Sequence, residues 1–198
     1  MEEKTKLQIM FYFTILYLLF FTMEAILKKN FEFLYYTFII SILISIIVFY
    51  HKKMHMTYNV MLGLVILGIL HMSGGNLHFG GTRLYDIWII NGIYKFDNFV
   101  HMVGAFVATL VMYSMLYPHL DKEIEHNKIL LSFLLILLAS GLGALNEISE
   151  LIAVVFFNAA AQVGDYMNNI FDLVFNLLGS ILACIYLMYY HHKIHNKK

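Results

Sequence analysis

Residues 9–50 read IMFYFTILYLLFFTMEAILKKNFEFLYYTFIISILISIIVFY, two long apolar runs separated only by the polar joint Lys28, Lys29 and Asn30. A helix that spans a membrane needs about 20 consecutive, mostly apolar residues, because lipid offers the backbone no hydrogen-bonding partner except itself. Each run has that length, and the joint is short enough for a tight helical hairpin. This stretch therefore predicts two membrane-spanning helices rather than the core of a water-soluble domain.

The composition of the whole chain agrees. Of 198 residues, 61% are hydrophobic and 13% are charged, against roughly 45–50% and 25% in average proteins. A soluble domain of this size buries only about 70% of its surface, so large apolar patches would remain in water. Lys plus Arg equals Asp plus Glu at 13 each, which leaves no basic excess for nucleic acid. The predicted partners are membrane lipids; nucleic acid is not expected, and no protein partner is indicated.

Four further apolar runs complete the pattern of an all-α, polytopic bundle. The six predicted spans cover residues 9–27, 31–50, 58–72, 98–117, 129–157 and 169–190. The Gly-rich stretch 74–81 is expected to form a loop after the third span. The fifth run stays apolar for nearly 30 residues, so it either tilts strongly or breaks near Gly141 and Gly143. No linker or internal repeat divides the chain, so residues 1–198 are predicted to form a single integral membrane domain.

The positions of the basic residues predict the orientation. Six spans put both termini on one side, and that side holds nine Lys residues against four Lys or Arg residues on the other. Short cytoplasmic loops are enriched in Lys and Arg. Both termini are therefore predicted to be cytoplasmic, in a cell membrane, with residues 73–97 and 157–168 outside the cytoplasm.

Most of the ionisable side chains near the spans are expected at the outer end of the bundle. Inserting one charged side chain at the centre of a span costs at least roughly 2.5–3.5 kcal/mol of free energy. Asp97 and His101 are four residues apart and share one helical face at the start of the fourth span. Glu147 follows Lys128 by about one membrane thickness at 1.5 Å per residue. Four helices are thus predicted to bring together His71, Asp97, His101, Glu147, Glu150, Asp172 and Asn176, with Asp165 in the loop before the last helix.

Several short motifs resemble a known family. They are LHMSGG at 70–75, LYD at 84–86, YKFDNFVHMVG at 94–104, NEISE at 146–150, GDY at 164–166 and DLVFNLLG at 172–179. Together they resemble the YjdF-like family of uncharacterised prokaryotic integral membrane proteins. A fainter similarity links the chain to VanZ-like proteins associated with glycopeptide resistance, but the arginine that those proteins carry near the residue corresponding to Asp165 is absent here. The resemblance implies a multi-pass cell-membrane protein and no particular activity.

The polar residues themselves suggest a divalent-metal site. His101, Glu147, Glu150 and Asp172 are the candidate ligands, and Asp97 would orient the imidazole. Asn176, His71 and Asp165 are expected around them. With no thiolate near, zinc, manganese or iron fits best. A metal-bound water could attack a phosphoester or acyl bond in a lipid or envelope substrate, with Glu147 and Asp172 as candidate catalytic residues.

Two other interpretations stay open. Carboxylates and histidines inside a bundle can relay protons or bind small cations for transport. They can also hold the helices in register as a structural or accessory protein. No HExxH, GxSxG, P-loop or CxxC motif is present to name a reaction. Enzyme, transporter and structural protein therefore remain alternatives.

Three smaller features carry expectations of their own. Glu24 and Lys28 are four residues apart and are expected to form an ion pair at the end of the first span. The loop around Trp88 is either a lid that holds Arg83 ready for an anionic headgroup or an interfacial segment with an aromatic anchor. Cys184 is expected to be a packing residue in the last span.

Overall fold

The computed structural model describes residues 3–51 and 53–195. Six long helices dominate the described chain: α1 (Glu3–Leu27), α2 (Phe31–Tyr50), α3 (Tyr58–Asn76), α4 (Phe96–Leu116), α6 (Lys128–Phe157) and α8 (Tyr166–His195). Each is long and apolar enough to cross a membrane. The sequence-based assignment of six spans is confirmed, with ends that differ from the predicted ones by a few residues.

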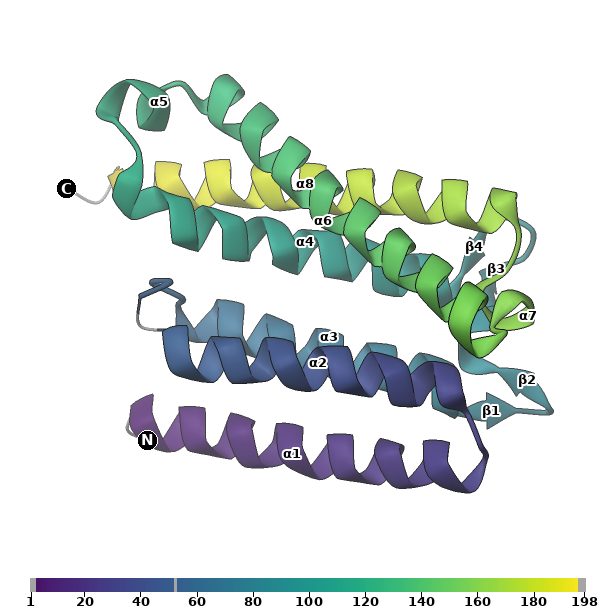
Figure 1. The fold of residues 1–198 in the computed structure, drawn as a ribbon. Coiled ribbons are helices and arrows are strands. Elements are labelled where there is room, and N and C mark those ends of the chain that lie inside the picture. The colour runs from purple at the N-terminus through teal and green to yellow at the C-terminus, as the bar shows by residue number, and fades with distance from the viewer. Residues whose placement is uncertain (1–2, 52, 196–198) are drawn as a thin grey trace.

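Short elements connect the long helices at both ends. Between α3 and α4 lie two small antiparallel hairpins and a 3-10 turn: β1 (His78–Phe79), β2 (Thr82–Arg83), η1 (Leu84–Asp86), β3 (Trp88–Ile90) and β4 (Tyr94–Lys95). The remaining short pieces are η2 (Tyr117–His119), α5 (Lys122–His126) and α7 (Ala160–Val163). We call the end of the bundle that carries residues 77–95 the hairpin end, and the opposite end the terminal end, because both ends of the described chain lie there (Figure 1).

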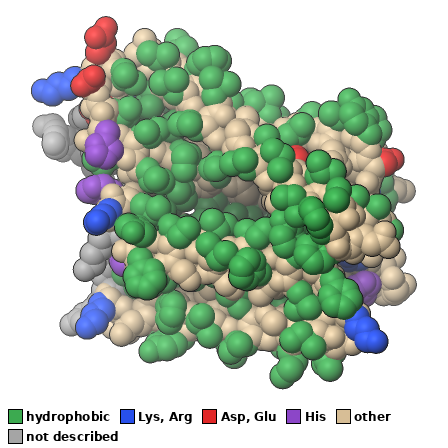
Figure 2. Space-filling model, viewed as in Figure 1, with side chains coloured by type: hydrophobic (Ala, Val, Ile, Leu, Met, Phe, Trp, Pro, Cys, Tyr) green, Lys and Arg blue, Asp and Glu red, His purple; other side chains and the backbone are tan. Residues whose placement is uncertain are grey.

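The six helices form two groups. In Figure 1, α1, α2 and α3 lie in the lower half, and α4, α6 and α8 lie in the upper half. Helix α4 packs mainly on α8, while α3 contacts α1 and joins the two groups through α4. Hydrophobic side chains cover most of the visible surface, and charged and histidine side chains gather towards its two ends (Figure 2). That distribution is the one expected of a bundle surrounded by lipid.

Helix α6 resolves the choice that the sequence left open for the fifth span. It runs unbroken over 30 residues, about 45 Å at 1.5 Å per residue, and crosses the other helices obliquely (Figure 1). Its first half packs on α8, and near its end the Phe157 ring stacks on Tyr35 of α2 at 5.1 Å between ring centroids. The helix therefore tilts rather than breaks.

The prediction of a loop at Gly74 and Gly75 is wrong, because α3 continues through both residues to Asn76. A Cβ atom at Gly75 would overlap the ring of Phe33, and one at Gly74 would overlap the ring of Tyr85. Here glycine lets aromatic rings pack against a helix backbone, as small residues do between membrane helices. Gly80 and Gly81, both with positive φ, do lie in the turn between β1 and β2.

Close approach of helices through small residues is seen at some of the glycines near the polar residues. A Cβ atom at Gly179 would lie 2.9 Å from the carbonyl carbon of Met102, so α8 passes directly over the backbone of α4 there. Gly143 likewise faces the side chain of Asn176. Gly141 differs, because no described atom of a neighbouring element lies within 4 Å of where its Cβ would be.

Candidate functional site

His101 is the centre of the polar region at the hairpin end. It lies in the second turn of α4, and only 9% of its side chain is exposed. Its Nε2 atom is 3.6 Å from Oδ1 of Asp97, one turn earlier on the same helix. The two residues therefore share one face of α4, as their spacing predicts.

Carboxylates from two other helices surround the same imidazole. Oε1 of Glu150 on α6 lies 3.9 Å from Nε2, and Oδ1 of Asp172 on α8 lies 3.8 Å from it. Oε1 of Glu147 lies 3.7 Å from the other ring nitrogen, Nδ1. We call these five residues the carboxylate–histidine cluster: Asp97, His101, Glu147, Glu150 and Asp172. Three helices supply it, and their convergence follows from the packing of α4 with α6 and α8.

Negative charge is not balanced within the cluster. Four carboxylates surround one imidazole, and no Lys or Arg nitrogen of the described residues lies within 4.0 Å of any of the four. Both carboxylate oxygens of Glu147 are buried without a hydrogen-bond partner among the described residues. The contacts to His101, at 3.6–3.9 Å, are longer than hydrogen bonds. Buried carboxylates in this arrangement require protons or a cation to offset their mutual repulsion.

Asparagine side chains hold the carboxylates in place, and sequence reasoning missed two of them. Asn98 donates to Oδ1 of Asp172 at 2.9 Å, and its own Oδ1 accepts from the backbone of Lys95. Asn168 donates to Oδ2 of Asp172 at 2.9 Å and to Oδ2 of Asp97 at 3.3 Å. These amides explain why Asp172, with no exposed surface, is tolerated in the bundle.

The second missed residue, Asn168, carried a weak signal, since it lies four residues before Asp172 on the same helical face. Asn98 follows Asp97 directly, but nothing in the sequence pairs it with a residue on α8. Asn146, noted from the sequence beside Glu147, donates to Oε1 of Glu150 at 2.7 Å.

His71 lies beside the cluster rather than in it. Its Nδ1 is 2.6 Å from the hydroxyl of Tyr85 in η1, and its ring stacks on Phe33 of α2. Burial, together with the nearby charges of Asp97 and Glu150, raises the pKa of Tyr85 well above its ordinary value. The phenol therefore stays protonated, and its hydroxyl is hydrogen-bonded to Nδ1 of His71.

The other two residues expected near the site are Asn176 and Asp165. Asn176, one turn beyond Asp172 on α8, is buried, and its Nδ2 has no hydrogen-bond partner within the described chain. Asp165 is exposed just before α8, where its Oδ1 accepts from the backbone of Asn168. It thus supports the start of α8 rather than the cluster.

Arg83 ties the loop of the hairpin end to two other elements. It makes a bidentate contact with Asp86, at 3.0 and 3.3 Å, and donates to the carbonyl of Gln162 in α7. Its Nη1 lies 3.8 Å from Oε2 of buried Glu32 on α2. Burial opposes the charge of the guanidinium, but Asp86 and Glu32 outweigh it and raise the pKa of Arg83. Arg83 is thus engaged with Asp86, with Glu32 and with the carbonyl of Gln162.

Two smaller expectations are confirmed. Nζ of Lys28 lies 2.6 Å from Glu24, forming the ion pair expected at the end of α1. Cys184 is buried among Leu131, Leu135 and Leu187, where α6 meets α8.

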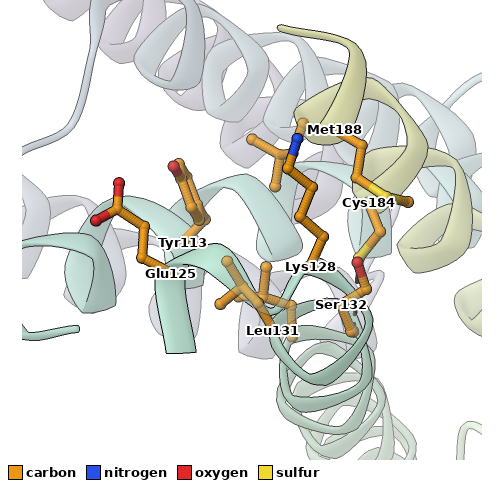
Figure 3. A pocket seen from close by; sticks show the side chains of 9 residues that line it. Tyr113, Glu125, Lys128, Leu131, Ser132, Cys184 and Met188 are labelled. Carbon is orange, nitrogen blue, oxygen red and sulfur yellow. Dashed lines mark hydrogen bonds between the residues drawn. The ribbon is translucent and has the colours of Figure 1, made fainter. Parts of the chain in front are cut away.

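A small pocket opens at the terminal end, far from the cluster. Its lining combines Tyr113 of α4, Glu125 of α5, Lys128 and Ser132 of α6 and Cys184 of α8. Figure 3 shows the side chains of Lys128 and Cys184 on facing elements above Ser132. None of the predicted site residues lines it, so it has no part in the candidate site.

The fold and its surface define a multi-pass membrane protein with six candidate spans. The chain belongs to the family described as Predicted membrane protein (DUF2238), whose sequence model matches residues 9–193. This match confirms the resemblance to the YjdF-like family and extends it to the first two spans. Neither the curated proteins nor the solved structures contain a match.

Proposed function

We propose that the carboxylate–histidine cluster binds a divalent cation. The observation that carries this proposal is the ring of four largely buried carboxylates around His101, with no Lys or Arg nitrogen of the described residues within 4.0 Å of them. A divalent ion would supply the missing positive charge and would be held by oxygen and nitrogen ligands that suit zinc, manganese or iron.

The ligand set that we propose is His101 with Asp97 and Asp172, because one ligand atom of each lies within 4.8 Å of the others and one oxygen of both carboxylates faces Nε2. Glu150 belongs to a second such group, with His101 and Glu147. Ligand distances of about 2.0–2.2 Å put neighbouring ligands of a tetrahedral ion about 3.3–3.6 Å apart. The distances of 3.6 and 3.8 Å from Nε2 to Asp97 and Asp172 are close to this, so a small contraction would bring these three ligands onto one ion. Compared with the sequence-based hypothesis, Asp97 becomes a ligand rather than the residue that orients the ring.

The chemistry that fits such a site is hydrolysis of a lipid or envelope substrate. A bound ion would lower the pKa of a water molecule towards neutrality and polarise a phosphoryl or acyl oxygen. Glu147, with both oxygens free of hydrogen bonds, is the carboxylate available as a general base, and Asp172 would act through the ion that it holds.

Metal analysis of the full chain in detergent tests the proposal. We expect about one equivalent of zinc, manganese or iron per chain after loading and desalting, and its loss in His101→Ala and in Asp172→Asn. Glu24→Gln is the matched control, because it removes a carboxylate at the same end but outside the cluster, and it should keep the metal. Wild-type protein that stays metal-free after loading with each of the three ions would disprove the proposal.

We further propose that the cluster faces the outside of a prokaryotic cell membrane, because the terminal side holds nine of the 13 Lys and Arg residues. Cys184 is the only cysteine in the sequence and is buried, so a maleimide would label the introduced cysteine alone. A cysteine introduced at exposed Phe79 should react with a membrane-impermeant maleimide in intact cells, whereas one at exposed Glu123 should react only after lysis. The reverse pattern would invert the orientation.

A further inference from the structure

The second hairpin, β3–β4, carries an apolar surface that no described element covers. Residues 87–94 read IWIINGIY and contain no charged side chain. Trp88, Ile89, Ile90 and Ile93 are each between 44% and 63% exposed. Outside the membrane spans, such a patch in water would be costly.

The hairpin lies beside the bundle, at the level of a span. Tyr94 of β4 packs on Phe175 of α8 with ring centroids 4.9 Å apart. Phe175 is nine residues into α8, about 14 Å along the helix axis, and lies within the candidate span Tyr166–Tyr189. The hairpin is therefore attached to the flank of a membrane helix rather than to its tip, and its apolar surface continues the lipid-facing surface of α8.

The two ends of the hairpin differ in polarity. Trp88 pairs with Lys95 across the strands, and Nζ of Lys95 lies 5.1 Å from the centre of the indole ring. The turn forms the other end of the hairpin. There Gly92 has a positive φ, and the backbone N–H of Ile93 donates to the carbonyl of Ile90. A Trp beside a Lys is typical of the headgroup level of a bilayer, where an amphipathic ring and a long cation meet lipid phosphates.

From these observations we propose that β3–β4 is a lipid-interface anchor: its exposed apolar residues enter the headgroup–acyl boundary of the leaflet at the hairpin end, beside Trp88 and Lys95. This proposal does not depend on metal binding. It would fix the hairpin end of α4, which begins at Phe96 directly after β4, at a defined depth in the bilayer.

Trp88 is the only tryptophan in the chain, so its fluorescence reports on this hairpin alone. The full chain is reconstituted into phosphatidylcholine vesicles with bromine near the headgroup end or deep in the acyl chains. We expect the shallow bromines to quench Trp88 more strongly than the deep ones, and aqueous iodide to have little effect. Efficient iodide quenching without bromine quenching would overturn the proposal. Shielding from both quenchers would also overturn it, because protein rather than lipid would then cover the hairpin.

Charged variants sharpen the test. Ile90→Asp and Ile93→Asp place a carboxylate at the exposed tip and should lower quenching by shallow bromines while increasing quenching by iodide. Phe79→Asp is the matched control, since Phe79 is equally exposed but lies in the β1–β2 hairpin. It should leave both quenching profiles at the wild-type values. Equal effects of the three variants would refute a specific role for the β3–β4 tip.

Discussion

Replacing Gly179 by alanine tests the closest helix contact next to the cluster. At this position α8 crosses the backbone of α4 at Met102, the residue after His101. The new Cβ would lie 2.9 Å from the Met102 carbonyl carbon, and the carbonyl oxygen is nearer still. Since ordinary contact begins at 3.4 Å and the oxygen is the nearest atom, the two backbones must separate by more than the roughly 0.5 Å that the carbonyl carbon alone requires.

Neither partner of this contact can rotate away, because both are helix backbone. Overpacking of this kind costs about 1–3 kcal/mol. The same movement separates His101 on α4 from Asp172 on α8, whose interacting atoms are already 3.8 Å apart. We therefore expect Gly179→Ala both to destabilise the fold and to weaken binding of the proposed metal ion.

The assay is unfolding in detergent, by heat or by denaturant, for Gly179→Ala beside Gly141→Ala. Gly141 also lies inside a long helix but has open space around it. There alanine should be neutral or should stabilise the protein by up to about 1 kcal/mol, since it favours the helix. If both variants have the stability of the wild type, or if Gly141→Ala is the more damaging, the assigned contact between α4 and α8 is wrong.

Three further outcomes are expected. Arg83→Met should lower the free energy of unfolding by about 3–5 kcal/mol, because it leaves buried Glu32 without its cation. The double variant with Glu32→Met should recover most of that loss. A single variant whose stability is within about 1 kcal/mol of the wild type would contradict this. Asn168→Leu should weaken metal binding in titration calorimetry by roughly 10–100-fold, as loss of a residue that orients ligands does, whereas Asp165→Asn should not reproduce that loss. Metal affinity should fall as the pH is lowered, because protons compete for the carboxylates and for His101, and an affinity that is flat from pH 8 to pH 5 would speak against these ligands.

The number of spans could be predicted from the sequence because the rule behind it is local. A run such as residues 31–50 has no alternative to a spanning helix, whatever surrounds it. The Asp97–His101 contact was predictable for the same reason, since helical spacing alone brings the two side chains together. The shared depth of Glu147 and Asp172 followed from counting residues along two spans.

What could not be predicted depends on contacts between distant segments. Gly74 and Gly75 are typical of loops, and only the rings of Phe33 and Tyr85 reveal why they are helical. In the same way, the bond from Asn98 to Asp172 joins residues 74 positions apart. Such pairs depend on which faces of two helices pack together, and a single sequence does not specify those faces.

The distribution of the cluster over α4, α6 and α8 has a consequence for the order of synthesis. A chain leaves the ribosome from its N-terminus, so Asp97, His101, Glu147 and Glu150 enter the membrane before the helix that carries Asn168 and Asp172. Until α8 is inserted, Asn98 lacks its acceptor on that helix and Asp97 lacks the amide of Asn168. The final helix thus completes the polar end of the bundle, and a nascent chain that stops short of it leaves Asp97 without the amide of Asn168.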